Sequence, residues 1–131
     1  MDDWTIVGII LIILIVITVG LMILRGDEDD WIQDSRGVWI KHGQPSKIPE
    51  YVLEQQGLID SALRLYSELI LTNAEINSQC LGTVGDYAVD IVHVPRSEED
   101  DLIENQCSAF RNGDVSHFIE LDKKGNIVRV V

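Results

Sequence analysis

The two cysteines, Cys80 and Cys107, have different chemistry depending on whether they are paired. Their spacing is unlike the C-x-x-C groups of metal sites. A disulfide is the simplest role for two cysteines in a small exported domain, because closing a loop compensates for a limited core. Two separate buried thiols in a reducing cytosol are the alternative. The sequence therefore predicts a structural Cys80–Cys107 disulfide in an oxidising compartment.

Three histidines are the other residues that could ligate a metal or move a proton: His42, His93 and His117. His93 and His117 would form a zinc set with Asp90 if their strands were neighbours, but Asp90 and His93 alternate onto opposite faces of a strand. Neither cysteine has the flanking signature of a nucleophile, and no phosphate-binding glycine loop is present. We therefore predict no catalytic residue, no metal site and no cofactor.

Acidic residues outnumber basic ones by 22 to 10, for a net charge of −12. All the Lys and Arg and twenty of the acids lie from Arg25 onward, so a nucleic-acid partner is not expected. One acidic run, Glu98–Asp101, follows Ser97. Ser97 and Asp100 have the spacing of a capping box, and acids in a first helical turn complement the helix dipole. This run predicts a short helix to about Gln106, with a calcium site as the alternative.

Trp4–Leu24 is an uncharged stretch of about twenty residues, long enough as a helix to cross the roughly 30 Å hydrocarbon core of a bilayer. A cleaved signal peptide is the alternative. It would need a basic start and a small-residue cleavage site, which neither the acidic Met1–Asp3 nor Val19–Met22 provides. The sequence thus predicts an uncleaved single-pass anchor that contacts the lipid bilayer through Trp4–Leu24.

The orientation of this anchor follows from several opposing signals. Arg25, Arg36 and Lys41 lie on its C-terminal side, which alone favours a cytoplasmic location for the rest of the chain. That rule depends here on one close arginine, and the run Asp27–Asp30 would face an anionic cytoplasmic leaflet. Together with the predicted disulfide, this favours a C-terminal domain outside the cytoplasm. A cytoplasm-facing subunit of a membrane complex remains the alternative.

Residues 25–48 are predicted to form an acidic juxtamembrane segment, a short β-hairpin and a linker. Trp31–Ile32 and Val38–Ile40 flank a turn signal at Asp34–Gly37. We interpret Trp31 and Trp39 as packing together or lying near the lipid headgroups. A carbohydrate- or lipid-facing platform is the functional alternative.

The stretch GVWIKHGQPSKIP, residues 37–49, resembles a segment that follows the membrane anchor in some small, uncharacterised exported proteins of archaea. In these a W-x-x-x-G-x-W-V-K-H-G-x-P type of pattern leads into a linker that contains proline. The resemblance covers about twenty residues of this chain. Gln33 stands where such relatives often carry cysteine, so any bridge there is not shared. The resemblance implies a surface-anchored protein and implies no activity.

Residues 49–131 predict one small α+β domain in the order α-β-α-β-β-β, with a long amphipathic helix packed on an antiparallel sheet of three to four strands. The helix runs from Pro49, its first residue, to about Gln79, with a possible division at Gly57. Its apolar stripe is Ile59, Leu63, Tyr66, Ile70 and Ala74. The predicted strands are Asp86–Pro95, Ser108–Arg111, Asp114–Leu121 and Asn126–Val131, with turns at Asn112-Gly113 and Gly125.

These features predict a membrane-anchored envelope protein, a non-catalytic binding or structural module, with a possible protein partner in the envelope. A pilin-like assembly subunit is the alternative, because such proteins also combine an N-terminal apolar helix, a long helix, an antiparallel sheet and a disulfide. Against it, Trp4–Leu24 contains no acid, a basic leader is missing, and the apolar helix does not continue directly into the domain.

Overall fold

The computed structural model describes residues 2–25, 29–72 and 78–131. The chain divides into two compact units. The first comprises Met1–Ile32 and Lys41–Lys47, and the second comprises Gln33–Ile40 and Ile48–Val131. The C-terminal domain is thus completed by a short segment from the hairpin region.

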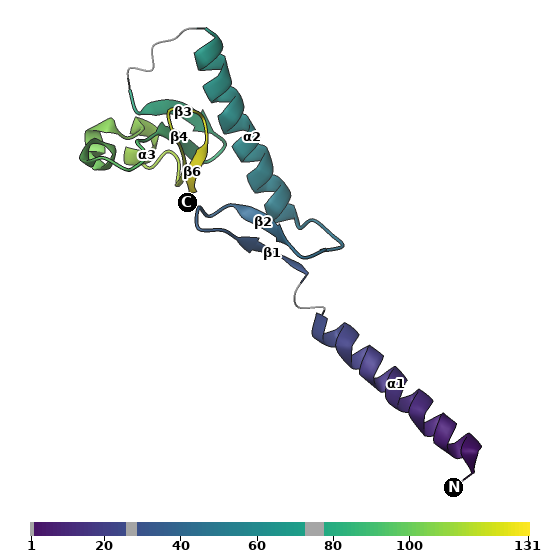
Figure 1. Cartoon of the computed structure of the whole chain (residues 1–131). Helices are drawn as coiled ribbons and strands as arrows, with labels where there is room; N and C mark the ends of the chain where they lie inside the picture. Colours follow the sequence, from purple (N-terminus) through teal and green to yellow (C-terminus); the bar gives the residue numbers. More distant parts are fainter. Residues whose placement is uncertain (1, 26–28, 73–77) are drawn as a thin grey trace. The chain divides into compact units, whose positions relative to one another are not determined.

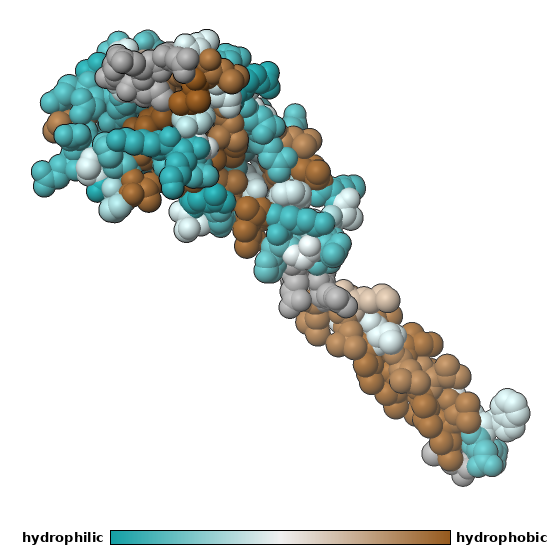
Figure 2. Space-filling model, turned by 45° about the horizontal axis from the view of Figure 1, so that its top comes forward, coloured by the Kyte–Doolittle hydropathy of each residue, from teal (hydrophilic) through white to brown (hydrophobic). Residues whose placement is uncertain are grey.

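Helix α1 (Asp3–Arg25) is apolar on every side, and Figure 2 shows its visible surface as almost continuously hydrophobic. In the described part of the chain it is the one helix long and apolar enough to span a membrane. The hydroxyl of Thr18 donates to the carbonyl oxygens of Leu14 and Ile15, both at 2.9 Å, so this polar group is satisfied within the helix. Of the acidic run that follows, Asp27 and Glu28 lie outside the described residues.

The predicted hairpin is confirmed: β1 (Asp30–Gln33) and β2 (Trp39–His42) form a two-stranded sheet. Asp34 builds its turn, because its carboxylate accepts hydrogen bonds from the backbone N–H groups of Arg36 (2.9 Å) and Val38 (3.2 Å). Gly37 completes the turn at φ +79°, a conformation that glycine adopts without steric cost.

Helix α2 (Glu50–Leu71) follows, with Pro49 as its N-cap and not its first residue. It is continuous through Gly57, so the division expected there is wrong. Its predicted continuation to Gln79 crosses residues 73–77, Ala74 among them, which lie outside the described part of the chain. On the apolar stripe, Ile59, Leu63 and Tyr66 pack against the core, whereas Ile70 is exposed.

The domain contains a four-stranded sheet in the order β3 (Cys80–Val84), β4 (Tyr87–Ile91), β5 (His117–Leu121) and β6 (Ile127–Val130). The α+β class is confirmed, but the described residues form two sheets of two and four strands instead of a single sheet of three to four. The larger sheet is mixed, because β4 and β5 are parallel while the outer pairs are antiparallel. Strand β3 was not predicted.

The two faces of this sheet are covered by different parts of the chain, as Figure 1 shows. One face packs against α2 and carries the larger core cluster of Ala62, Val89, Ile119, Leu121 and Val130. The other face lies under the crossover from β4 to β5, where Cys107 and Val115 pack against Ala88. A parallel pair requires such a crossover, and this one covers the sheet.

The crossover contains two 3₁₀ turns, η1 (Glu98–Asp101) and η2 (Ile103–Asn105), and the short helix α3 (Ser108–Arg111). The capping box of Ser97 and Asp100 is confirmed. The strand predicted at Ser108–Arg111 is wrong, because the Asn112-Gly113 pair ends a helix instead of turning a hairpin. Gly113 has φ +78°, which suits the residue after a helix as well as a tight turn. The predicted turn at Gly125 does connect β5 to β6.

Candidate functional site

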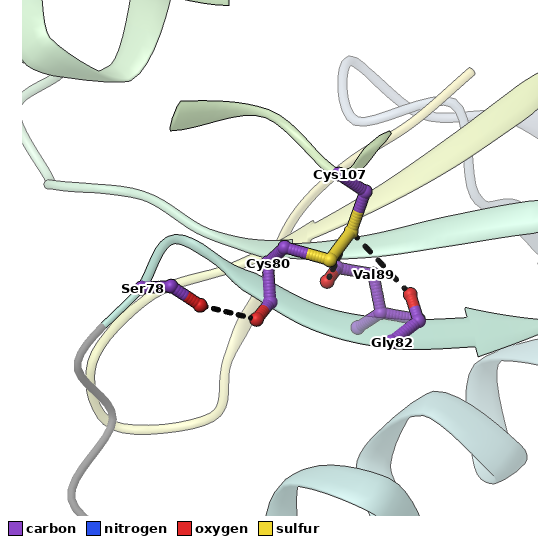
Figure 3. Close-up of a disulfide and its surroundings, with 5 residues drawn as sticks. All are labelled: Ser78, Cys80, Gly82, Val89 and Cys107. Carbon is purple, nitrogen blue, oxygen red and sulfur yellow. Dashed lines mark hydrogen bonds between the residues drawn. A yellow bond between two sulfur atoms is a disulfide. The ribbon is translucent and has the colours of Figure 1, made fainter. Parts of the chain in front are cut away.

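Cys80 begins β3 and Cys107 is the N-cap of α3, and they form a disulfide-compatible pair (Figure 3). Their Cα atoms are 4.7 Å apart, within the roughly 4.4–6.8 Å that a disulfide requires. The Sγ atom of Cys107 is fully enclosed and lies 3.5 Å from the carbonyl oxygen of Gly82 and 3.6 Å from that of Val89. A bonded sulfur carries no proton, so these are packing contacts.

Asp90 lies beside the cysteine pair in a row of polar residues that crosses the sheet. In this row Cys80 pairs with Asp90, Asp90 with Glu120, and Glu120 with Arg129. Asp90 is 5% exposed, and its Oδ1 atom has no hydrogen-bond partner among the described residues. Burial raises its pKa to about 6; the backbone N–H of Cys107 opposes this shift, and the charge of Glu120 adds to it.

Glu120 is a buried carboxylate that forms hydrogen-bonded ion pairs with two arginines. Arg96 donates to its two oxygens at 2.9 and 3.0 Å, and Arg129 donates at 3.0 and 3.1 Å. The Arg129 guanidinium also lies 4.9 Å from the centre of the Phe118 ring. This charge-assisted network holds the crossover to β5 and β6. Both arginines are hydrogen-bonded to Glu120, and the charge of Arg96 only partly offsets the raised pKa of Asp90.

The three residues considered for zinc are not brought together. Asp90 lies by the cysteine pair, His93 contacts Asp100, and His117 stacks on Tyr87 with ring centres 4.8 Å apart. The described residues do place an Asp90 oxygen and both sulfur atoms within 4.8 Å of one another. Bonded sulfurs are not the thiolates that bind metals, so this group is not a metal centre.

His93, Ser97 and Asp100 resemble a catalytic triad in composition, but not in geometry. Ser97 Oγ and Asp100 Oδ1 approach the same ring nitrogen of His93, Nδ1, at 3.1 and 3.0 Å. A relay needs the acid and the nucleophile on opposite nitrogens. Burial would raise the pKa of Asp100, but hydrogen bonds from Ser97 and His93 outweigh it and lower that pKa to about 2. The hydrogen bonds among His93, Ser97 and Asp100 stabilise the chain at the start of the crossover.

A second arrangement joins aromatic and acidic side chains on the α2 side of the domain. We name it the aromatic hollow, a depression of about 540 Å³ in the second unit. Its rings are Trp39, Tyr51, Tyr87 and His117, and its carboxylates are Glu54 and Asp86. The centres of the Trp39 and Tyr51 rings are 4.7 Å apart. Its volume is within the ~300–1,000 Å³ of small-molecule sites.

Gln55 holds Trp39 at this hollow. It is 9% exposed, and its side-chain amide bonds to the hairpin at both ends. Oε1 accepts from the backbone N–H of Trp39 at 2.8 Å, while Nε2 donates to the carbonyl oxygen of Gly37 at 2.8 Å. Arg36 contributes its carbonyl oxygen, which accepts from Val130 N–H on β6 at 2.7 Å. The backbone of Trp39 is therefore positioned by α2 and the large sheet.

The acids of the hollow come from two elements. Glu54 is one turn from Tyr51 on α2, and Asp86 lies in the turn between β3 and β4, where its Oδ1 accepts from Ser116 N–H at 3.1 Å. Burial raises the pKa of Tyr87, and the charges of Asp86 and Glu54 raise it further. Both carboxylates thus act on the same phenol. The residues that line the hollow include no lysine or arginine.

Sequence reasoning singled out Trp39 and the alternative of a ligand platform, but not the rest of the hollow. Tyr51 and Glu54 have helix spacing that would place them on one face. What could not be predicted is that Gln55, a polar residue in a largely apolar stripe, is the point where the hairpin docks. Trp31 is not part of the hollow; its Nε1 donates to the carbonyl oxygen of Lys47 at 3.0 Å.

Comparisons of this chain with protein-family models, with curated proteins and with solved structures gave no match. The resemblance of residues 37–49 to archaeal exported proteins stays a prediction. Sequence and geometry define the chain by class, as an α+β domain that follows an N-terminal apolar helix.

Proposed function

We propose that this chain is a single-pass membrane protein that holds a non-catalytic binding domain outside the cytoplasm, and that the aromatic hollow is its binding surface. The apolar length of α1 supports the anchor. The disulfide-compatible cysteines support an oxidising compartment, since cytosolic thiols are kept reduced. The acidic domain favours solubility and cationic partners over nucleic acid.

One observation carries the binding role: rings and carboxylates from α2, from strands β2, β4 and β5, and from the turn between β3 and β4 converge on one hollow. Half-buried rings on a rigid scaffold supply contact area, and the nearby acids supply orientation. Tyr51 is 46% exposed and Glu54 is also exposed, so both side chains are accessible to a ligand. By contrast, the carboxylates of Asp100 and Glu120 are engaged in internal hydrogen bonds, and Asp90 is buried beside the cysteine pair, away from solvent. Binding is therefore favoured over catalysis.

The experiment uses full-length protein in a nonionic polyoxyethylene detergent, with Trp4→Phe and Trp31→Phe so that Trp39 is the sole tryptophan. Its fluorescence is titrated with three probes of different chemistry: glucose, glutamate and choline. A saturable change with at least one probe supports the proposal, provided that Tyr51→Ala weakens it and Ile70→Ala, an exposed position on the same helix outside the hollow, does not. Silence toward all three probes, or equal responses in both variants, would overturn the hollow as the binding surface.

A further inference from the structure

We infer that the aromatic hollow binds an alkylammonium group, the positively charged end of an organic amine. The inference rests on the proposed binding function and names the ligand class that the same site would take. It follows from three properties of the hollow: its ring faces, its carboxylates without a lysine or arginine partner, and its side-chain amides, which already bond to the hairpin.

The ring faces supply the first attraction. The π-face of an aromatic ring attracts a cation, and tryptophan and tyrosine do so best. Trp39 and Tyr51 lie at 56° to one another with centres 4.7 Å apart, and Tyr87 lines the same hollow. All three rings therefore belong to the lining of one hollow. Because Gln55 fixes the backbone of Trp39, little ordering is needed when a cation arrives.

The carboxylates supply the second attraction. Glu54 makes no ion pair or side-chain hydrogen bond within the described residues 2–25, 29–72 and 78–131. Where the structure describes the chain, Asp86 has one basic neighbour, His117, whose Nε2 lies 3.8 Å from its Oδ2. Elsewhere in the domain, acids such as Glu120 and Asp34 have arginine partners. The aromatic hollow therefore combines two acids with no resident lysine or arginine, and a cation of the ligand would complete it.

The remaining chemistry selects an organic cation over a sugar or a bare metal ion. The amides best suited to sugar hydroxyls already bond to the hairpin: that of Gln55 is occupied at both ends, and Gln33 Nε2 donates to the carbonyl oxygen of Gly37 at 3.4 Å. In the described part of the chain, the metal-type grouping of side chains is at Cys80, not here. Ring faces cannot replace the oxygen ligands that a hard metal ion requires. The positive charge of an alkylammonium can interact with both the ring faces and the carboxylates.

The test compares choline with its neutral carbon isostere, 3,3-dimethylbutan-1-ol, on the full-length Trp39-only protein. The two molecules have nearly the same shape and differ in charge. We expect saturable binding of choline and at least about tenfold weaker binding of the alcohol, because the cation–π and ionic terms are lost. Glu54→Gln should raise the Kd for choline about three- to tenfold. Glu68→Gln, an exposed acid on the same helix outside the hollow, should leave it unchanged.

A second arm replaces choline with Nα-acetyl-lysine amide, because an alkylammonium can belong to a quaternary headgroup or to a lysine side chain. Tighter choline binding would assign the first source, and tighter lysine amide binding the second; either supports the inference. Equal affinity for choline and the neutral alcohol would overturn it, as would equal losses in Glu54→Gln and Glu68→Gln. Binding of glucose without binding of either amine would also overturn the ligand class, while leaving the proposed binding function intact.

Discussion

Asp90 is a carboxyl group that the fold buries without neutralising. Its neighbour in the sheet, Glu120, takes both nearby arginines, and the cysteine pair on its other side offers no charge. An acid in this position favours its protonated form, because burial penalises the charge. Near neutral pH the domain therefore loses stability by keeping this residue ionised.

The pH dependence of stability should report this cost. The pKa of Asp90 is about 3.8 in an unfolded chain and about 6 in the fold, so between these values the folded state binds more protons and stability falls as pH rises. We expect this group to make unfolding about 1 kcal/mol easier at about pH 7.5 than at about pH 5. Asp90→Asn should remove that difference in urea unfolding followed by tryptophan fluorescence.

Asp100 provides the internal check on this measurement. Its pKa is lowered to about 2, so its contribution to stability is present above about pH 4 and is lost only as the pH falls further. The two residues affect stability over separate pH ranges. Asp90→Asn should therefore leave unchanged the loss of stability that Asp100 causes at low pH. If the variant keeps the wild-type slope between about pH 5 and pH 7.5, the charge of Asp90 is not the cause.

Gly37 and Gly113 share a backbone conformation but differ in their surroundings. Their φ angles are +79° and +78°, but a Cβ at Gly37 would overlap the carbonyl oxygen of Val130, whereas a Cβ at Gly113 meets nothing within 4 Å. Gly113→Ala should cost about 1 kcal/mol through its backbone conformation alone. Gly37→Ala should cost about 2 kcal/mol more, because the hairpin turn must move off β6. Urea midpoints of the two variants test this, and equal losses would contradict it.

At the scale of elements, the features that follow from neighbouring residues could be predicted. The hairpin turn at Asp34–Gly37, the capping box at Ser97 and the turn at Gly125 are each encoded within a few positions. Asn112-Gly113 was misinterpreted because the same two residues suit a hairpin and a helix end. The choice between them is made by the packing of α3 under β4, which no local pattern reveals.

Strand β3 and the parallel pairing were missed for related reasons. The helical pattern was extended to Gln79, and Gly82 weakened the strand signal of Cys80–Val84 even though Gly85-Asp86 is a turn of hairpin type. Parallel pairing of β4 with β5 depends on where a long crossover returns. The candidate site depends on such distant contacts too, because Gln55 and Trp39 meet only once the hairpin has docked.

The cysteine pair joins β3 to the crossover, and its loss should loosen that connection. Closing a loop of this length contributes on the order of 3–4 kcal/mol in the chain-entropy model. Replacing both Cys80 and Cys107 by serine should lower the free energy of unfolding by a few kcal/mol, with choline binding at the aromatic hollow retained under conditions where the variant is folded. Alkylation under denaturing, non-reducing conditions, followed by mass analysis, checks the pair in the native protein.

The outcome of that alkylation is unambiguous. A bonded pair leaves both cysteines unmodified until a reductant is added. Two freely alkylated thiols in protein isolated under thiol-trapping conditions would contradict the bridge. They would also remove the main support for an oxidising compartment.

At the scale of the whole molecule, an apolar helix and an acidic domain share one chain. All but two of the charged side chains lie from Arg25 onward, and α1 between Trp4 and Leu24 carries none. If the domain lies outside, protease added to intact cells should remove it and leave the anchor protected. Detection by an antibody to the domain, with a cytosolic protein and a known surface protein as controls, measures this. Full protection of the domain while the surface control is digested would reverse the orientation.

The parallel pair at the centre of the sheet also sets an order of events during folding. Hairpins β3–β4 and β5–β6 close over short turns, whereas joining β4 to β5 must wait for the whole crossover. Such long-range pairing is slow because loop-closure entropy is lost before the contacts form. If the chain is translocated starting from its N-terminal side, the β3–β4 hairpin is complete before Cys107 emerges. Oxidation would then fasten the crossover to that hairpin before the last two strands arrive.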